Sequence, residues 1–284
     1  MNYHKPMTQL IRNRISVRTY DPKPIPEDRL KAIRLFLEDL NATAVSKIRF
    51  ALLTRSEKSE NMKLGTYGII SGTHTYLVGL TDLEKGNAME LGYLFEKVVL
   101  KATELDLGTV WLGGTFNRGD FEKNLAMNPN ETIAIVSPIG IPKSNRSLID
   151  SAFRLGAGSN NRKPWETLFF FNDPSHPLNK EEAGAYAEVL DMVRLGPSAS
   201  NKQPWRIVKT GNDFHIFLER TPGYASIMKY DLQLNDIGIA QCHFEMTCQE
   251  LGLYGSWQSV EPKPSIENWV YCLTWKAKPS SGNL

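Results

Sequence analysis

The chain has 284 residues, of which 41% are hydrophobic and 23% are charged, as is usual for a soluble globular protein. Its formal net charge of +2, with no long block of one sign, gives no indication of a nucleic-acid or anionic-membrane surface. No apolar stretch approaches the roughly 20 residues that span a bilayer, and positions 1–8 lack the apolar core of a secretion signal. The cysteines form no CxxC pair, which suits a reducing compartment; they are Cys242, Cys248 and Cys272. We therefore expect a soluble, cytoplasmic protein.

The first motif, Arg-x-Ser-x-Arg, lies near the N-terminus. Side chains alternate along an extended segment, so Arg14, Ser16 and Arg18 are expected to face one side. Two guanidinium groups and a hydroxyl on one side predict a phosphate-binding surface with charge-assisted hydrogen bonds. The alternative is a solvated basic face whose arginines pair with Asp21 or Glu27.

Each half of the chain then contains a helix, a loop and a strand. The helices are predicted at Ile25–Leu40 and at Leu178–Val193, where Asn179 is a suitable N-cap. The strands that follow are predicted at Ile48–Leu53 and Trp205–Val208. The repeated order is the first indication of an internal duplication.

Two longer segments, Met89–Trp111 and Asn235–Trp257, align without a gap. Both match an acidic residue followed by Leu/Ile-Gly, then Glu-Leu-x-Leu and a final Trp. Apolar residues at three- and four-residue spacing predict a buried helix in each, ended by a glycine-containing turn. We therefore predict two duplicated halves, residues 1–164 and 165–284, with the connector at Asn145–Pro164.

Each half has kept a different motif. The counterpart of the Arg-x-Ser-x-Arg segment falls near Thr167–Phe171, which reads Thr-Leu-Phe-Phe-Phe. The counterpart of the loop at residues 197–205 is Asn41–Lys47, where only Ser46 is left of the polar pattern. A fused two-fold dimer that maintains one of its two sites would show this pattern, so we expect one site per chain.

The loop at residues 197–205 reads Pro-Ser-Ala-Ser-Asn-Lys-Gln-Pro-Trp. Its short polar side chains are suited to reading the edge of a polar ring or a ribityl chain; they are Ser198, Ser200, Asn201 and Gln203. The alternative is an ordinary loop, since Ser, Asn and Pro are common loop residues, with Trp205 in the core.

The stretch after the first long helix reads Leu-Gly-Thr-Val-Trp-Leu-Gly-Gly-Thr-Phe at residues 107–116. The paired glycines Gly113 and Gly114 allow a flat ligand to approach the backbone and leave their N–H groups free to donate. A helix C-cap followed by a buried strand would explain Gly108 without any ligand.

Together these motifs resemble the nitroreductase-like FMN-dependent oxidoreductases, from about Ile11 to Trp257. The likeness is greatest to a branch labelled "TM nitroreductase", in which two half-units share one chain and a string like that at residues 65–68 occurs. It implies an α+β fold of central, mainly antiparallel sheets flanked by helices, as an internally duplicated pseudo-dimer. Because the interface that holds the cofactor would be internal, a monomer is expected.

The resemblance also implies the cofactor contacts. The Arg-x-Ser-x-Arg motif would hold the FMN phosphate and part of the polar edge of the ring, the paired glycines would face N5 and O4, and Arg162 would return to the phosphate. The polar loop of the other half would complete the site. The implied contacts are Arg14, Ser16, Arg18, Gly113, Gly114, Arg162, Pro197, Ser198, Ala199, Ser200 and Asn201. Gly65 and Gly68 stand where the family has a polar or basic residue, so Tyr67 is expected to line the pocket instead. Phe116 is a second candidate pocket residue.

The implied activity is ping-pong transfer from transiently bound NAD(P)H, through one FMN per chain, to a nitroaromatic or quinone-like acceptor. No catalytic side chain is expected, because the flavin would carry the chemistry. No metal site is expected either, because the histidines lack metal-ligand spacing; they are His4, His74, His176, His215 and His243. Three alternatives stay open. They are another flavin reaction (dehydrogenation, reductive dehalogenation or flavin breakdown), a flavin-binding protein without turnover, and a scaffold that no longer binds FMN.

Overall fold

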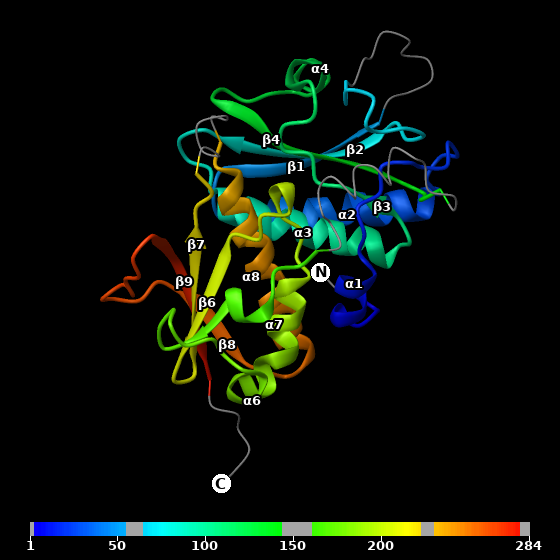
Figure 1. Ribbon diagram of the computed structural model, residues 1–284. Helices are drawn as coiled ribbons and strands as arrows, with labels where there is room; N and C mark the ends of the chain where they lie inside the picture. The colour runs from blue at the N-terminus through cyan, green and yellow to red at the C-terminus, as the bar shows by residue number, and fades with distance from the viewer. Residues whose placement is uncertain (1–2, 55–64, 144–160, 223–229, 279–284) are drawn as a thin grey trace. The chain divides into compact units, whose positions relative to one another are not determined.

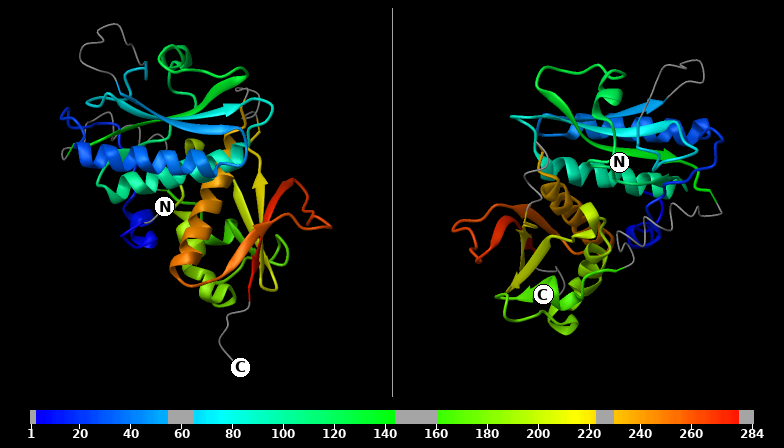
Figure 2. Two further views of the ribbon diagram at one scale, coloured as in Figure 1. Left: turned by 180° about the vertical axis from the view of Figure 1, so that it is seen from behind. Right: turned by 45° about the horizontal axis from the view of Figure 1, so that its top comes forward.

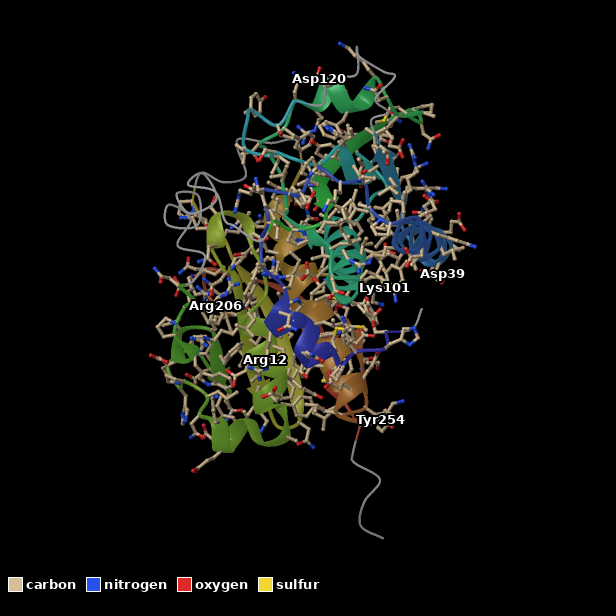
Figure 3. The ribbon with its side chains drawn as sticks, turned by 90° about the vertical axis from the view of Figure 1, so that its right-hand side faces the viewer. Arg12, Asp39, Lys101, Asp120, Arg206 and Tyr254 are labelled. Carbon is tan, nitrogen blue, oxygen red and sulfur yellow. The ribbon has the colours of Figure 1, made fainter. Side chains whose placement is uncertain are left out.

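The computed structural model describes residues 3–54, 65–143, 161–222 and 230–278, and the chain divides into two compact units (Figure 1). Unit 1 comprises Met1–Lys5 and Asn13–Ser159, and unit 2 comprises Pro6–Arg12 and Asn160–Leu284. The boundary thus lies five residues before the predicted one, and most of helix α1 (Met7–Asn13) belongs to unit 2. Arg12 of α1, labelled in Figure 3, donates to Glu188 over 2.6 Å within that unit.

Unit 1 is built on a four-stranded antiparallel sheet of order β1-β2-β4-β3. The strands are β1 (Ile48–Thr54), β2 (Thr75–Asp82), β3 (Gly108–Thr109) and β4 (Glu131–Gly140). The helices are α2 (Glu27–Thr43), α3 (Ala88–Glu104) and α4 (Arg118–Glu122). Helices α2 and α3 run along one face of the sheet, and α4 lies on the other (Figure 2).

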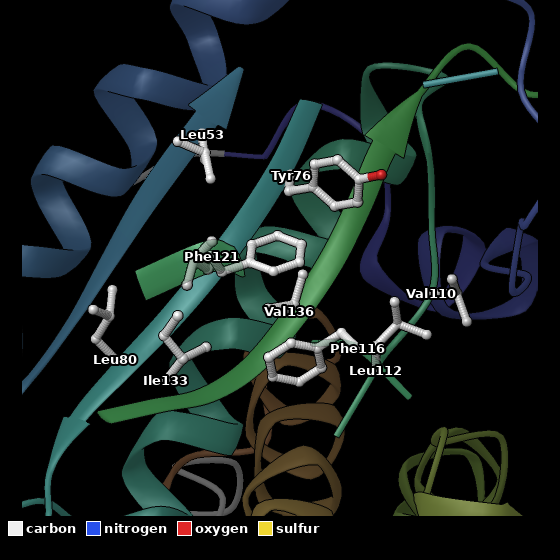
Figure 4. Close-up of a cluster of buried hydrophobic side chains, with 10 residues drawn as sticks. Leu53, Tyr76, Leu80, Val110, Leu112, Phe116, Phe121, Ile133 and Val136 are labelled. Atoms are coloured by element: carbon white, nitrogen blue, oxygen red, sulfur yellow. The ribbon is translucent and has the colours of Figure 1, made fainter. Parts of the chain in front are cut away.

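Apolar side chains fill the space between this sheet and the segment that carries α4 (Figure 4). The cluster consists of Leu53, Tyr76, Val78, Leu80, Val110, Leu112, Phe116, Phe121, Ile133 and Val136. The ring of Phe121 makes edge contacts with Tyr76 and Phe116, whose centroids lie 5.2 and 5.5 Å away. The segment after β3 is therefore fixed to the sheet by burial of apolar side chains.

Unit 2 is built on a five-stranded sheet of order β5-β6-β7-β9-β8, in which β5 is parallel to β6 and the other pairs are antiparallel. The strands are β5 (Phe169–Phe171), β6 (Trp205–Thr210), β7 (Asp213–Glu219), β8 (Gly255–Gln258) and β9 (Trp269–Ala277). The helices are α6 (Lys180–Ala183), α7 (Ala187–Arg194) and α8 (Leu232–Glu250), with 3-10 turns η1 (Trp165–Thr167), η2 (Gly184–Tyr186) and η3 (Ala199–Asn201).

The two units share one order of elements, which is consistent with duplicated halves. Strands β1, β2, β4 and β3 correspond in sheet position to β6, β7, β9 and β8. Each long helix, α3 or α8, precedes the short strand β3 or β8. After these helices the chain turns through a left-handed residue, Asp106 (φ 57°) or Gly252 (φ 68°), at aligned positions.

One predicted correspondence is wrong. The N-terminal segment of unit 1 pairs with β3, through a parallel bridge between Ser16 and Thr109. Strand β5 pairs instead with β6, whose counterpart in unit 1 is β1. The Arg-x-Ser-x-Arg segment and Thr167–Phe171 thus occupy different edges of their sheets, and the latter is not a decayed copy of the former.

The predicted helices are found, with two corrections. Asn179 is confirmed as an N-cap and forms a capping box with Glu182, but the helix that it begins is broken at Gly184 (φ 58°) into α6, η2 and α7. Helix α2 continues to Thr43, so it takes in the first residues of the predicted loop. The predicted connector at Asn145–Pro164 lies mostly outside the described residues. None of the helices described is both long enough and apolar enough to cross a membrane.

Candidate functional site

In unit 1 the Arg-x-Ser-x-Arg segment is held by backbone hydrogen bonds on two sides. Val17 N donates to Thr109 O of β3 over 2.9 Å, and Ser71 N donates to Arg18 O over 3.0 Å. The segment makes isolated bridges and forms no regular strand. Its side chains accordingly do not alternate in exposure, since Arg14 and Val17 are buried and Ile15 is exposed.

Arg14 lies in a buried polar cluster of its own. Its side chain is 8% exposed, and its Nε lies 3.9 Å from Oε1 of Glu96 on α3. Trp111 Nε1 donates to Oε2 of the same carboxylate over 2.9 Å. Burial lowers the pKa of the Arg14 guanidinium, and the charge of Glu96 opposes that shift. Within the described part of the chain, the Arg14 Nε donates no hydrogen bond.

The alternative partners considered for the two arginines are engaged elsewhere. Oδ2 of Asp21 lies 3.8 Å from Nζ of Lys23, and Oε1 of Glu27 accepts from Nη1 of Arg34 over 2.9 Å. The interpretation of a solvated basic face therefore does not describe Arg14, which is buried beside Glu96.

Gly108 is required by close packing. A Cβ at this position would lie 2.7 Å from Cγ2 and 2.8 Å from Cβ of Val17. The left-handed residue after α3 is Asp106, so the interpretation of Gly108 as a helix cap is wrong. Its missing side chain allows the N-terminal segment to lie against β3.

Gly113 and Gly114 lie in a bend between β3 and α4. Neither backbone N–H donates a hydrogen bond to any group in residues 3–54 or 65–143, the described part of unit 1. The contact of these two donors with a ligand stays a prediction. Phe116, the nearby candidate pocket residue, is 5% exposed and belongs to the core cluster of Figure 4.

Tyr67 is the other candidate pocket residue, and its ring is 69% exposed. Its backbone is left-handed, with a φ of 49°, which is uncommon for a bulky residue. The carbonyl of neighbouring Gly65 accepts from Asn117 N over 2.8 Å, next to Phe116. The turn at Tyr67 is therefore tied to the segment that carries α4.

In unit 2 the polar loop has an unusual backbone. Ser200, Asn201 and Gln203 have φ values of 49°, 54° and 46°, all in the left-handed region. Such residues cost about 1–3 kcal/mol each and persist where the surrounding contacts determine them. Ser198 Oγ accepts from Gln203 N over 2.9 Å and closes the turn from within.

Residues 161–163 hold one side of this loop. Arg162 Nη1 donates to Asn201 Oδ1 over 2.8 Å, and its Nη2 donates to Leu195 O over 2.9 Å. Lys163 N donates to Gln203 Oε1 over 2.8 Å. Two of the predicted contacts, Arg162 and Asn201, are thus brought together, and Gln203, which is 1% exposed, is part of the support. Trp205 is fully buried, as its alternative interpretation as a core residue requires.

Asp236 of α8 holds the other side. Ala199 N donates to both of its carboxylate oxygens, over 3.0 and 3.2 Å. Burial raises the pKa of Asp236 well above its ordinary value, and the hydrogen bond from Ala199 opposes that shift. Sequence analysis did not select this residue, although it is the acidic position at which the two long helices align.

The candidate residues therefore form two sets. Unit 1 holds Arg14, Ser16, Arg18, Tyr67, Gly113, Gly114 and Phe116, and unit 2 holds Arg162, Pro197, Ser198, Ala199, Ser200 and Asn201. Across the described ranges, no group of three or more His, Cys, Asp and Glu side chains is arranged to hold a metal ion.

A family model described as "Putative TM nitroreductase" matches residues 6–248. The structure is similar to that of a putative nitroreductase from Thermotoga maritima, with a TM-score of 0.58 at 20% sequence identity, over 98% of this chain and 95% of that one. It also matches a nitroreductase family protein from Clostridium difficile with a TM-score of 0.40 at 16% identity, over 55% of this chain and 92% of that one. A comparison with curated proteins gave no match.

Proposed function

Because the chain belongs to the family described as "Putative TM nitroreductase", we propose that it is an FMN-dependent oxidoreductase that passes electrons from NAD(P)H to a nitroaromatic or quinone-like acceptor. The observation that carries the proposal is that the family match spans both the Arg-x-Ser-x-Arg segment and the polar loop. The α+β fold, with two antiparallel-rich sheets, is that of the nitroreductases.

The residues of unit 1 suit the phosphate end of FMN. The buried Nε of Arg14 has no hydrogen-bond acceptor among the residues that the structure describes, and a buried donor without a partner costs about 1–3 kcal/mol. A phosphate oxygen would satisfy such a donor. We propose that Arg14, Ser16 and Arg18 bind the phosphate and part of the ring's polar edge, with Arg162 as a further phosphate contact.

Backbone N–H groups of unit 1 are the proposed donors to the ring end of FMN. The N–H groups of Gly113 and Gly114 have no other acceptor in the described part of unit 1, which supports their proposed contact with N5 and O4. In the polar loop, Ala199 N already donates to Asp236 and Ala199 O accepts from Lys202 N over 3.1 Å, so the methyl group of Ala199 is its proposed contact. Pro197, Ser198, Ser200 and Asn201 complete the proposed contacts.

When bound, FMN would supply the redox chemistry, which is hydride transfer from NAD(P)H and onward transfer of electrons to the acceptor. The chain's own residues orient the ring and donate hydrogen bonds to its edge, and none is proposed as a catalytic acid or nucleophile. The exposed ring of Tyr67 is suited to stack on a flat acceptor or a nicotinamide. Phe116 is left out of this pocket because it lies in the core.

We further propose that the chain binds one FMN and acts as a monomer in the cytoplasm. The shared strand order of the two units supports the monomer, because a duplicated chain carries both copies that a dimeric relative would need. One FMN per chain is supported by the presence of one arginine motif and one polar loop in the sequence. The cysteines of the described residues are free thiols, as a reducing compartment favours. Light scattering that showed an obligate dimer would contradict a site completed by one chain.

Anaerobic stopped-flow spectroscopy of the FMN-loaded protein tests the activity. We expect NADH or NADPH to bleach the flavin absorbance band and an added nitroaromatic or quinone to restore it. In the steady state, double-reciprocal plots of rate against nucleotide concentration, at several fixed acceptor concentrations, are expected to be parallel. Bound FMN that neither nucleotide reduces would identify a flavin-binding protein without turnover. Reduction without transfer to either acceptor would identify a different flavin reaction.

A further inference from the structure

Two carboxylates at corresponding positions hold the loops that precede strands β1 and β6. In unit 2, both carboxylate oxygens of Asp236 accept from Ala199 N. In unit 1, the carboxylate of Glu90 accepts from Val45 N over 2.6 Å and from Ser46 N over 2.9 Å. The gapless alignment of the two long helical segments places Glu90 and Asp236 at one position of the repeat.

The two loops differ in backbone strain. The loop held by Glu90 contains no left-handed residue, whereas the loop held by Asp236 contains Ser200, Asn201 and Gln203 in that region. Residues 161–163 restrain this second loop from the side of Asn201 and Gln203. The hydrogen bond to Asp236 is the contact that fixes its beginning, at Ala199.

Asp236 is a costly residue for this purpose, being 3% exposed on the second turn of α8. Burial of a carboxyl group is unfavourable unless the group is hydrogen-bonded. Burial raises the pKa of Asp236, and an amide oxygen at the same place would accept the hydrogen bond from Ala199 N.

We propose that Asp236 is a positioning residue for the cofactor: its carboxyl group fixes Ala199 and thereby sets the orientation of the neighbouring Ser200 side chain toward FMN, while Arg162 holds the Asn201 side chain. The proposal rests on the proposed function, because it gives the loop a cofactor to contact. Glu90 performs the same local task for a loop without predicted cofactor residues, and it therefore serves as the matched control.

The test compares D236A, D236N and E90A with the wild-type protein. FMN affinity is measured by fluorescence titration, the geometry of bound FMN by visible circular dichroism, and folding by the thermal midpoint of the FMN-free protein. We expect D236A to bind FMN about 10-fold more weakly and to change the dichroic band, since a buried donor loses its acceptor. D236N is expected to stay within about two-fold of wild type, because its amide oxygen replaces the lost acceptor.

E90A is expected to lower the thermal midpoint while its FMN affinity stays within about two-fold of wild type. The proposal is overturned if D236A retains wild-type affinity for FMN, or if D236N loses as much affinity as D236A. It is also overturned if E90A lowers FMN affinity as much as D236A does. A lower midpoint for D236A with unchanged affinity and dichroism would show a structural role only.

A second variant covers the case in which D236A does not fold. Ala199→Pro removes only the donor, and it is compatible with the extended backbone of Ser198 (φ −150°, ψ 158°) and with the first position of a helical turn. If the hydrogen bond from Ala199 to Asp236 is what supports FMN binding, A199P lowers the affinity for FMN. The D236N/A199P double variant then binds FMN no more weakly than A199P alone. A further loss in the double variant would contradict the proposal.

Hydrogen exchange of residues 198–203 in the FMN-free protein separates this inference from the proposed function. D236A should speed exchange at Ala199 by about 10-fold, and D236N should not. Wild-type protein that binds no FMN would refute the proposed function and the cofactor role of Asp236 together. Unchanged exchange in D236A beside normal FMN binding in wild type would refute only the inference.

Discussion

Arg14 and Arg18 belong to one short motif, yet their surroundings differ. Arg14 is 8% exposed and lies beside the fully buried Glu96, which also accepts from Trp111. Arg18 is half-buried, and its carbonyl accepts from Ser71 N. The first arginine therefore has a structural task besides any contact with a phosphate.

Substituting each arginine by alanine separates these tasks. Arg18→Ala should weaken FMN binding by roughly 1.5–3 kcal/mol, as for a hydrogen bond to a charged group, and leave the stability of the FMN-free protein nearly unchanged. Arg14→Ala should also destabilise the FMN-free protein, by about 3 kcal/mol, because Glu96 would stay buried without its cation. Flavin titration and urea unfolding of the FMN-free variants measure the two effects. If R18A held FMN as tightly as wild type, the proposal that Arg18 binds the FMN phosphate would be wrong.

Individual residue types and spacings are visible in the sequence, but their partners are not. The motif identified Arg14, and nothing nearby in the sequence pointed to Glu96, since that pair forms only when the N-terminal segment lies against the sheet and α3. Phe116 was assigned to a pocket for the same reason, although it packs on Phe121 in the core. Burial depends on the tertiary fold.

At the scale of elements, the site of unit 1 depends on how closely the N-terminal segment approaches β3. Val17 N donates to Thr109 O, and the side chain of Val17 fills the space beside Gly108. This contact places Ser16 and Arg18 next to the strand that leads to Gly113 and Gly114. Any side chain at position 108 should therefore push the Arg-x-Ser-x-Arg segment away from β3 and from the residues that follow it, Gly113 and Gly114.

Gly108→Ala should therefore reduce stability by about 1–3 kcal/mol, as overpacking does, and weaken FMN binding as well. Val17→Gly in the same background should restore part of the stability and of the FMN binding, since the three atoms nearest to the added Cβ all belong to Val17. Gly119→Ala is the control, because its nearest neighbour would lie at an ordinary 3.6 Å. Thermal unfolding and flavin titration report the effects. Equal losses in G108A and G119A would show that close approach at Gly108 is not the cause.

Elements with strong local signals were predicted well. The aligned long segments became α3 and α8, and Asn179 caps α6, because periodicity and capping are local properties. The strand partners were not predictable in this way. The run Phe169–Phe171 adds in parallel to β6, a pairing between residues about 40 positions apart that no local pattern specifies.

At the scale of the whole chain, the two units repeat one strand order, and each unit carries a different set of candidate contacts. The sequence alignment of the long helices anticipated this repetition. It also suggested a decayed copy of the arginine motif at Thr167–Phe171, which the sheet topology contradicts. The expectation of one site now rests on the two motifs that are present.

The flavin content of the purified chain tests the central claim most directly. The protein is incubated with excess FMN and freed of unbound flavin, and the flavin released on denaturation is quantified against the protein concentration, with R18A measured in parallel. We predict about one FMN per chain for wild type and a smaller amount for R18A, as expected from the loss of a charged contact. Two FMN per chain, or none, would contradict the account.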